Sequence, residues 1–200
     1  MRSWFCKLPL AGFTIILAAC ASSPPDNITN SCEIFYDKSD WYDEAKDSFE
    51  KWGVPIHVQL AIIHQESSFK YDAKPPKDYL LGFIPWGRKS SAYGYAQVKD
   101  GTWDWYKEKT GNWGADRDDF GDAVDFIGWY GSVSYKMLGI SKWDARKQYL
   151  AYHEGHGGYK RKTYNNKAWL VDVSKKVERN AARYRAQLGK CRDSLESSWW

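Results

Sequence analysis

The segment that most constrains this chain is 54–69, VPIHVQLAIIHQESSF. Pro55 suits the first helical position, where its missing N–H costs nothing, and apolar residues then recur at helical spacing. The pattern predicts a buried helix that carries a carboxyl group, Glu66, near its C-terminal end. Burial disfavours the ionised form, so the pKa of Glu66 is expected to rise, as a general acid requires. The alternative is a helix that ends in polar residues, with Glu66 in solvent.

The first nineteen residues have the pattern of an export signal. Arg2 and Lys7 precede an apolar run that is too short to span a membrane. The run ends in LAAC at 17–20, which resembles the lipobox of bacterial lipoproteins. The resemblance implies cleavage before Cys20 and lipid on its thiol. With Ala21 next, it also implies sorting to the periplasmic face of an outer membrane. An ordinary signal peptide, with Cys20 incidental, is the alternative.

The cysteine positions agree with export. Cys6 leaves with the signal and Cys20 would carry the lipid, so Cys32 and Cys191 remain. An exported protein meets an oxidising compartment, so we predict a Cys32–Cys191 disulfide that joins the start of the domain to its last helix. The predicted organisation is a signal peptide at 1–19, a lipidated tether at 20–38, a single domain at 39–191 and a tail at 192–200.

Composition excludes one class of partner and leaves another open. The formal net charge is +4, or +2 once Arg2 and Lys7 are removed, which is too mildly basic for a nucleic-acid-binding protein. Twelve tryptophans and fourteen tyrosines are more informative. Such rings line sugar-binding clefts and also fill hydrophobic cores, and composition does not separate these uses.

Periodic apolar residues predict a mostly helical single domain, without internal repeats or clear strands. The proline-rich segment 70–92 is the exception. It is expected to be a long loop or a short hairpin, which either flanks a cleft at Glu66 or forms a surface excursion. Helices are predicted at about 39–51, 54–69, 100–110, 118–138, 143–155 and 168–188, several of them ended by glycine.

Two polar clusters invite a metal-binding interpretation. Four aspartates within 116–122 precede a helix; they complement its dipole or form a calcium loop, although the EF-hand spacing is absent. His153, Glu154 and His156 lack the spacing of a zinc helix, and glycines interrupt them, so ordinary loop or cleft residues are favoured. We therefore predict no metal ion and no cofactor. His64 is interpreted as a helix residue with a hydrogen-bond partner, with a place in the cleft as the alternative.

Three short patches follow one another at 66–69 (ESSF), 94–97 (GYAQ) and 151–155 (AYHEG). Their order and spacing resemble the E-S-x-F, G-L-M-Q and A-Y-N-A-G motifs of SLT-type lytic transglycosylases, which are relatives of goose-type lysozyme. The first motif is intact. The second has Tyr-Ala for Leu-Met, and the third has His-Glu for Asn-Ala. The resemblance covers residues 41–188.

The resemblance implies a mainly α, lysozyme-like (α+β) fold whose central helix ends at the catalytic residue, Glu66. It implies a lyase that cleaves the β-1,4 bond between N-acetylmuramic acid and N-acetylglucosamine in peptidoglycan and leaves 1,6-anhydro ends. The partners are then glycan strands and, through the lipid on Cys20, a membrane; a monomer is expected. By the same resemblance, Tyr152 hydrogen-bonds Glu66 and Ser67 orients the cleft. The substrate-binding positions are Ser67, Gly94, Tyr95, Ala96, Gln97, Tyr152 and His153.

The lytic route needs only one carboxyl group. Glu66 protonates the leaving oxygen and then, as a base, takes the proton of the muramic C6 hydroxyl as that oxygen closes onto C1. Two other functions stay open. A lysozyme-type hydrolase needs a second carboxylate within ~10 Å across the bond, and Glu154 and Asp100 are candidates. A non-catalytic peptidoglycan-binding lipoprotein would use the same cleft without reaction.

Overall fold

The structure is a computed structural model that describes residues 23–81, 83–88 and 90–197. Helices make up most of it, so the predicted mainly helical class is confirmed. Among the described residues, no helix is both long and apolar enough to cross a bilayer. The elements are α1 (Ser31–Asp37), α2 (Asp40–Trp52), α3 (Ile56–Ser67), β1 (Lys77–Leu80), β2 (Ile84–Arg88), α4 (Asp100–Thr110), α5 (Phe120–Leu138), α6 (Ala145–Lys160), the 3-10 turn η1 (Thr163–Asn166) and α7 (Ala168–Ser197).

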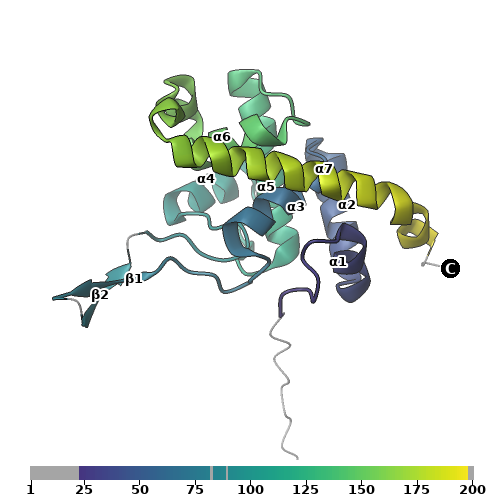
Figure 1. Cartoon of the computed structure of the whole chain (residues 1–200), viewed down its shortest axis with the longest axis horizontal. Coiled ribbons are helices and arrows are strands. Elements are labelled where there is room, and N and C mark those ends of the chain that lie inside the picture. The colour runs from purple at the N-terminus through teal and green to yellow at the C-terminus, as the bar shows by residue number, and fades with distance from the viewer. Residues whose placement is uncertain (1–22, 82, 89, 198–200) are drawn as a thin grey trace, which may run out of the picture.

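Helix α3 is the predicted central helix, and the other helices pack around it (Figure 1). Nine of its twelve residues are buried, so it has almost no solvent-facing side. It contacts α2, α5, α6 and α7, and the long helix α7 runs across it. Pro55 precedes it as the N-cap, in an extended conformation that directs the chain into the first turn. The apolar segment 54–69 therefore forms the core of the domain.

The end of α3 is fixed by an unusual backbone turn. Ser68 and Phe69 both adopt left-handed conformations, with φ of 53° and 61°, which side-chain-bearing residues rarely do. The ring of Phe69 is fully buried and lies 6.0 Å from that of Trp41, and this packing holds the turn in place. The chain therefore leaves the helix axis directly after Ser67, and Glu66 lies in the last turn.

Much of the aromatic content fills the core. Trp41 stacks on Phe120 with ring centroids 3.8 Å apart, and Tyr95 meets both rings edge-on at 5.6 Å. Trp103 and Trp129 are also buried, against the rings of α4 and α5. Filling the core, one of the two uses that composition left open, therefore accounts for these residues.

The start of the domain differs from the prediction. Segment 31–37 was assigned to the tether, but it forms α1 and packs against α7. The side chains of Ile34 and Phe35 are buried in that contact, which a solvated tether would not provide. Cys32 on α1 is joined to Cys191 on α7 by a disulfide, with Cα atoms 6.0 Å apart. The folded domain thus begins before residue 39.

Two helices extend further than predicted. Helix α7 runs to Ser197, so the described part of the predicted tail is helical, and Leu195 anchors it in the core. Helix α6 continues to Lys160, past the glycines that were expected to end it. The expected break is still present as a kink, because Gly155 has a non-helical conformation (φ 72°, ψ 159°). A single glycine of this kind interrupts the helix without terminating it.

Segment 70–92 contains the short hairpin that was one of its two predicted forms. Strands β1 and β2 pair antiparallel, with an irregularity between Asp78 and Tyr79. The hairpin projects from the helical body (Figure 1), and Leu81 and Phe83 at its tip are exposed.

Candidate active site

A cavity of ≈ 400 Å³ opens beside the last turn of α3. This volume is within the range of sites that bind small molecules or short polymer segments. The walls come from α3, α4, α5, the loop before α4 and the kinked part of α6. Of the described residues in segment 70–92, only Ala92 lines it. The lining residues are Glu66, Ala92, Gln97, Val98, Lys99, Thr102, Phe126, Tyr130, Tyr152, His153, Glu154 and Gly155.

Glu66 contributes the carboxyl group of this cavity. Burial raises its pKa to about 7, although a hydrogen bond with the side chain of Tyr149 acts in the opposite direction. The raised pKa expected from the sequence is therefore present, and the alternative of a simply solvated carboxylate is not. With a pKa near neutrality, the group can give a proton and later accept one.

The tyrosine that holds Glu66 is not the predicted one. Tyr149, which is buried, makes the side-chain hydrogen bond with Glu66. The hydroxyl of Tyr152 donates instead to the carbonyl oxygen of Ala96, at 2.5 Å. A hydroxyl has one proton to donate, so Tyr152 fixes the loop wall while Tyr149 orients the carboxyl group. Both residues lie on one face of α6, three positions apart, and only the fold decides which of them reaches Glu66.

Replacing Tyr149 by phenylalanine is expected to raise the pKa of Glu66 further, by about one unit, because a hydrogen bond to the ionised form is lost. A ¹³C NMR titration of the Glu66 carboxyl carbon measures this directly. The matched control is Tyr152→Phe, whose hydroxyl is bonded to Ala96 and should leave the pKa nearly unchanged. A larger shift in Tyr152→Phe than in Tyr149→Phe would reverse the two assignments.

The loop at 94–97 is held rigidly at the cavity edge. Gly94 has a φ of 77°, and a Cβ there would lie 1.9 Å from the carbonyl oxygen of Arg117, so only glycine fits. Gln97 is also left-handed (φ 50°), and its amide nitrogen donates to the carbonyl oxygens of Ala73 (2.8 Å) and Gly94 (2.9 Å). These bonds leave the amide oxygen of Gln97 as an acceptor for a ligand in the cavity.

Four of the predicted substrate-binding residues lie behind the cavity wall rather than in it: Ser67, Gly94, Tyr95 and Ala96. Ser67 is buried, and its hydroxyl donates to the carbonyl oxygen of Ile63, within its own helix (3.2 Å). The Tyr95 ring is buried against Trp41. These positions support the site, whereas Gln97, Tyr152 and His153 face it.

Glu154 also lines the cavity, but its carboxylate is fully engaged. It accepts hydrogen bonds from Lys167 (2.7 Å), Thr163 and His153 (3.2 Å), and its side chain is 3% exposed. Burial alone would raise its pKa; these hydrogen bonds outweigh that effect and lower the pKa to about 2. Glu154 is therefore a fixed anion and a weak base. Asp100, the other candidate for a second carboxylate, pairs with Arg117 (2.8 Å) and does not line the cavity.

The histidines and aspartates considered for metal binding have other partners. His156 stacks on Tyr130 and bonds Ser134 (3.0 Å), and His64 bonds Tyr184 (2.5 Å), which confirms its interpretation as a helix residue with a partner. Asp119 caps α5, as the dipole interpretation of the acidic cluster requires. Within the described part of the chain, no three His, Cys, Asp or Glu side chains are arranged to hold a metal ion.

Sequence reasoning missed several residues of the site. Tyr149 is one, and its place one helical turn before Tyr152 was a usable signal. Phe126 and Tyr130 of α5 also line the cavity. Lys99, the N-cap of α4, and Thr102, in its first turn, complete that wall.

The comparisons with known proteins agree with this architecture. A family model described as Transglycosylase SLT domain matches residues 8–191. No curated protein and no solved structure gives a match.

Proposed function

The chain belongs to the transglycosylase SLT domain family, a family of peptidoglycan transglycosylases, and from this premise we propose that it is a lytic transglycosylase with a single catalytic carboxyl group. It cleaves the bond between N-acetylmuramic acid and N-acetylglucosamine and forms 1,6-anhydro ends. The observation that carries this proposal is Glu66, with a pKa near 7 in a cavity whose other carboxylate is already engaged.

In this mechanism Glu66 acts twice. Protonated at first, it gives its proton to the glycosidic oxygen as the bond to C1 breaks and an oxocarbenium-like state forms. The ionised carboxylate, stabilised by Tyr149, then removes the proton from the C6 hydroxyl of the muramic residue. That oxygen bonds to C1, so the product carries an internal ether and no water is consumed. Gln97 and His153, which line the cavity, contact the sugars in this mechanism.

The state of Glu154 favours this route over hydrolysis. A hydrolase needs a second carboxylate that activates water or attacks C1. Glu154 has a pKa of about 2 and three hydrogen-bond donors on its oxygens, so it is poorly suited to either task. Its charge instead holds His153 at the cavity surface and ties α6 to the segment before α7 through Lys167.

Analysis of the released products by mass spectrometry tests the proposal. Muropeptides from purified peptidoglycan should be lighter than the hydrolytic products by one water molecule. Glu154→Gln should release the same anhydro products, because the mechanism does not use Glu154. Reducing ends from the unmodified enzyme would establish a hydrolase. An absence of products, together with binding to peptidoglycan, would favour a non-catalytic wall-binding protein.

Activity should also fall as pH rises above about 7. The reaction starts from protonated Glu66, and the protonated fraction declines tenfold per pH unit above its pKa. The descending limb can be located by measuring kcat/KM from about pH 5 to about pH 9, roughly two units on either side of the pKa of Glu66. A limb that stays flat to pH 9 would show that protonated Glu66 is not the acid.

We also propose that the protein is anchored through lipid on Cys20 at the periplasmic face of an outer membrane. The support is the sequence pattern at 17–20. Cys20 lies outside the described residues, as does the predicted signal peptide. Incorporation of labelled fatty acid into the protein, abolished in Cys20→Ser, tests the anchor. Fractionation of the two membranes tests its location.

A further inference from the structure

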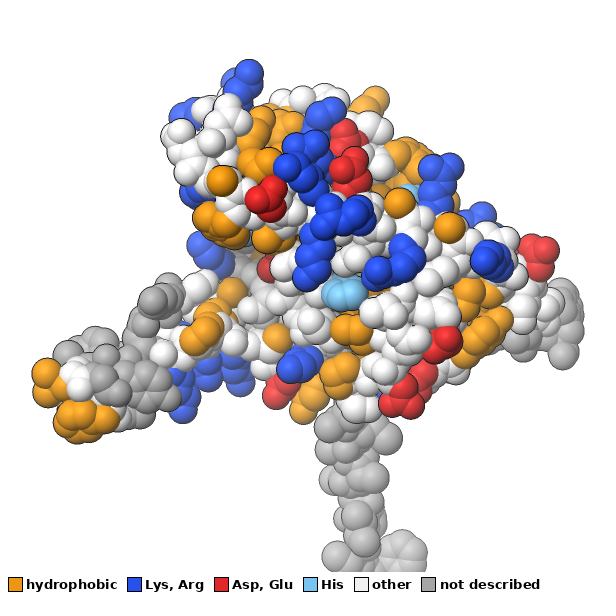
Figure 2. Space-filling view, viewed as in Figure 1, with side chains coloured by type: hydrophobic (Ala, Val, Ile, Leu, Met, Phe, Trp, Pro, Cys, Tyr) orange, Lys and Arg blue, Asp and Glu red, His pale blue; other side chains and the backbone are white. Residues whose placement is uncertain are grey.

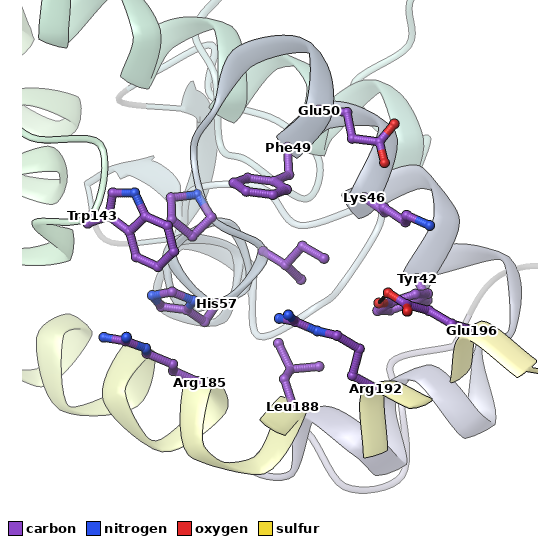
Figure 3. Close-up of a pocket in the computed structure, with 12 residues that line it drawn as sticks. Tyr42, Lys46, Phe49, Glu50, His57, Trp143, Arg185, Leu188, Arg192 and Glu196 are labelled. Carbon is purple, nitrogen blue, oxygen red and sulfur yellow. Dashed lines mark hydrogen bonds between the residues drawn. The ribbon is translucent and has the colours of Figure 1, made fainter. Parts of the chain in front are cut away.

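A second cavity lies at the opposite end of α3 from the candidate active site (Figure 3). It has a volume of ≈ 280 Å³ and is bordered by α2, the start of α3 and α7. A wider hollow of ≈ 670 Å³ continues from it, and the two share His57, Trp143 and Arg185. Because His57 and Glu66 are nine positions apart on one helix, the two ends are separated by about 14 Å along its axis. The second cavity is therefore distinct from the first.

His57 is the central polar group of this cavity. Its side chain is 8% exposed, and it makes no hydrogen bond to any described residue. Figure 3 shows its ring pointing into the cavity, near Trp143, whose ring centroid lies 5.5 Å away. Burial lowers the pKa of His57 to about 4, and the charges of Arg185 and Arg192 act in the same direction. The ring is thus neutral near pH 7 and keeps one N–H to donate.

Two arginines about two turns apart on α7 supply the charge. Arg185 and Arg192 are seven positions apart, so they share one face of the helix, and their side chains lie on either side of His57 in Figure 3. Neither makes an ion pair with a described residue; Arg185 lies over the ring of Trp143, 5.5 Å from its centroid. Helix α7 as a whole is basic, with seven Lys and Arg against four Asp and Glu, and Figure 2 shows its cationic side chains gathered on one surface.

The remaining charges restrict an anion to the His57 side of the cavity. Glu196 accepts a hydrogen bond from Tyr42 (2.9 Å) at the far end, and the charge of Arg192 also acts on Tyr42. In the wider hollow, Asp144 caps α6 and pairs with Lys147 (2.8 Å). The charged groups that border the two spaces are Lys46, Glu50, Arg185, Arg192 and Glu196 in the first, and Asp144, Glu178, Arg185 and Lys190 in the second.

We propose that this cavity binds the carboxylate of a short peptide. Arg185 and Arg192 pair with the carboxylate oxygens, and His57 donates its N–H to one of them. The start of α3 adds the partial positive charge of a helix N-terminus, since the backbone N–H groups of Ile56 and His57 donate to no acceptor within the helix. Trp143, which is 54% exposed, offers a flat apolar surface to the neighbouring part of the peptide.

The source of such a peptide rests on the proposed function. The stem peptides of peptidoglycan are short and end in carboxylates. A strand in the catalytic cavity lies at the other end of α3, so the second cavity would hold the stem peptide of a different strand. The enzyme would thereby stay attached to the wall while the catalytic cavity releases its product.

The test is an NMR titration of the His57 ring in the full folded protein at pH 5, which is about one unit above its pKa. The probe is N-acetyl-D-alanyl-D-alanine, and its C-terminal amide is the matched neutral ligand. The acid should produce a saturable shift and raise the pKa of His57 by about one unit, because an anion stabilises the charged ring. The amide should produce no shift. An equal response to the amide, or to acetate at the same concentrations, would overturn the proposal of a peptide carboxylate site.

Variants locate the site on α7. Arg185→Gln/Arg192→Gln should weaken binding of the acid at least tenfold and, without ligand, raise the pKa of His57. The control, Lys176→Gln/Arg179→Gln, removes the same charge from the same helix outside the cavity and should bind normally. If both double variants lost affinity for the acid equally, the loss would come from the net charge of α7 and the proposed site would be rejected. Glu66→Gln should bind the acid as the unmodified protein does. The test of the second cavity is therefore independent of whether the proposed catalytic function is correct.

Discussion

Replacing Glu66 by glutamine is expected to lower the rate of muropeptide release by about a thousandfold or more, with binding of peptidoglycan retained. Glutamine has nearly the same shape but cannot protonate the glycosidic oxygen or accept the C6 proton. General acid–base catalysis contributes roughly a hundredfold to ten-thousandfold, and here one group supplies both steps. The released fragments can be quantified by chromatography and mass spectrometry. Full lytic activity in Glu66→Gln would remove the basis of the proposed mechanism.

Glu44 provides a matched control for this variant. Burial, reinforced by Asp119 and Asp40, also raises its pKa to about 7, but it lies on α2 and does not line the catalytic cavity. Glu44→Gln therefore removes a carboxyl group of the same acidity from another place. It should leave the rate within about twofold, since it touches no group of the site. A comparable loss in both variants would point to a general effect of charge on the fold.

The catalytic variant Glu66→Gln should also be more stable than the unmodified protein at high pH. The folded-state pKa of Glu66 is about 7, above the ordinary value of 4.5, so the folded state holds the proton more tightly than the unfolded state. The associated stability is fully present below pH 4.5 and is lost as pH rises through 7. At pH 8, Glu66→Gln should exceed the unmodified protein by up to about 3 kcal/mol. Unfolding by urea at pH 4 and pH 8 measures the difference and shows that the inactive variant is folded.

Removing the disulfide by Cys32→Ser/Cys191→Ser is expected to lower the free energy of unfolding by about 3 to 5 kcal/mol. The bond joins residues 159 positions apart, so it restricts almost the whole domain in the unfolded state. This is a large share of the ~5–15 kcal/mol that stabilises a typical domain. Guanidinium unfolding monitored by tryptophan fluorescence gives the value. Activity at low temperature should be retained, because neither cysteine lines the catalytic cavity.

The unmodified protein treated with a reductant should match the double serine variant. Limited proteolysis should then cut first near α1, which is held against α7 only by apolar packing and hydrogen bonds once the disulfide is gone. Among them, the hydroxyl of Ser31 donates to the carbonyl oxygen of Tyr184 (3.1 Å), and the hydroxyl of Tyr184 donates to the carbonyl oxygen of Ile28. Two reactive thiols in the unreduced mature protein would show that the bond does not form.

The sequence was sufficient to predict helices α2 to α7 and the location of the central one. The segment 54–69 has apolar residues on all sides, and glycine ends α2 and α4 where the pattern placed it. It was less informative at the domain ends. Residues 31–37 show no strong helical period, and their order comes from burial against α7. That contact joins segments more than 150 positions apart, which no local pattern reveals.

The site was also predictable only in part, because its local motifs could be read from the sequence but its hydrogen bonds could not. Glu66, Gln97, Tyr152 and His153 were placed in one cavity from three short patches, and all four line it. The roles within those patches were not determined, because a hydrogen bond depends on side-chain direction. Ser67 bonds within its own helix, and Tyr152 bonds a loop carbonyl.

The sequence by itself determined a helical domain with one carboxylate at the end of its most apolar helix, because hydrophobic periodicity and glycine positions are local properties. Only the tertiary structure decided the chemical state of that carboxylate and of its neighbour. Glu66 has a raised pKa because the fold buries it beside a single donor, Tyr149. Glu154 has a lowered one because the fold brings Lys167 and Thr163 to its oxygens. Proton affinity depends on desolvation and on partners distant in sequence, and both exist only after folding.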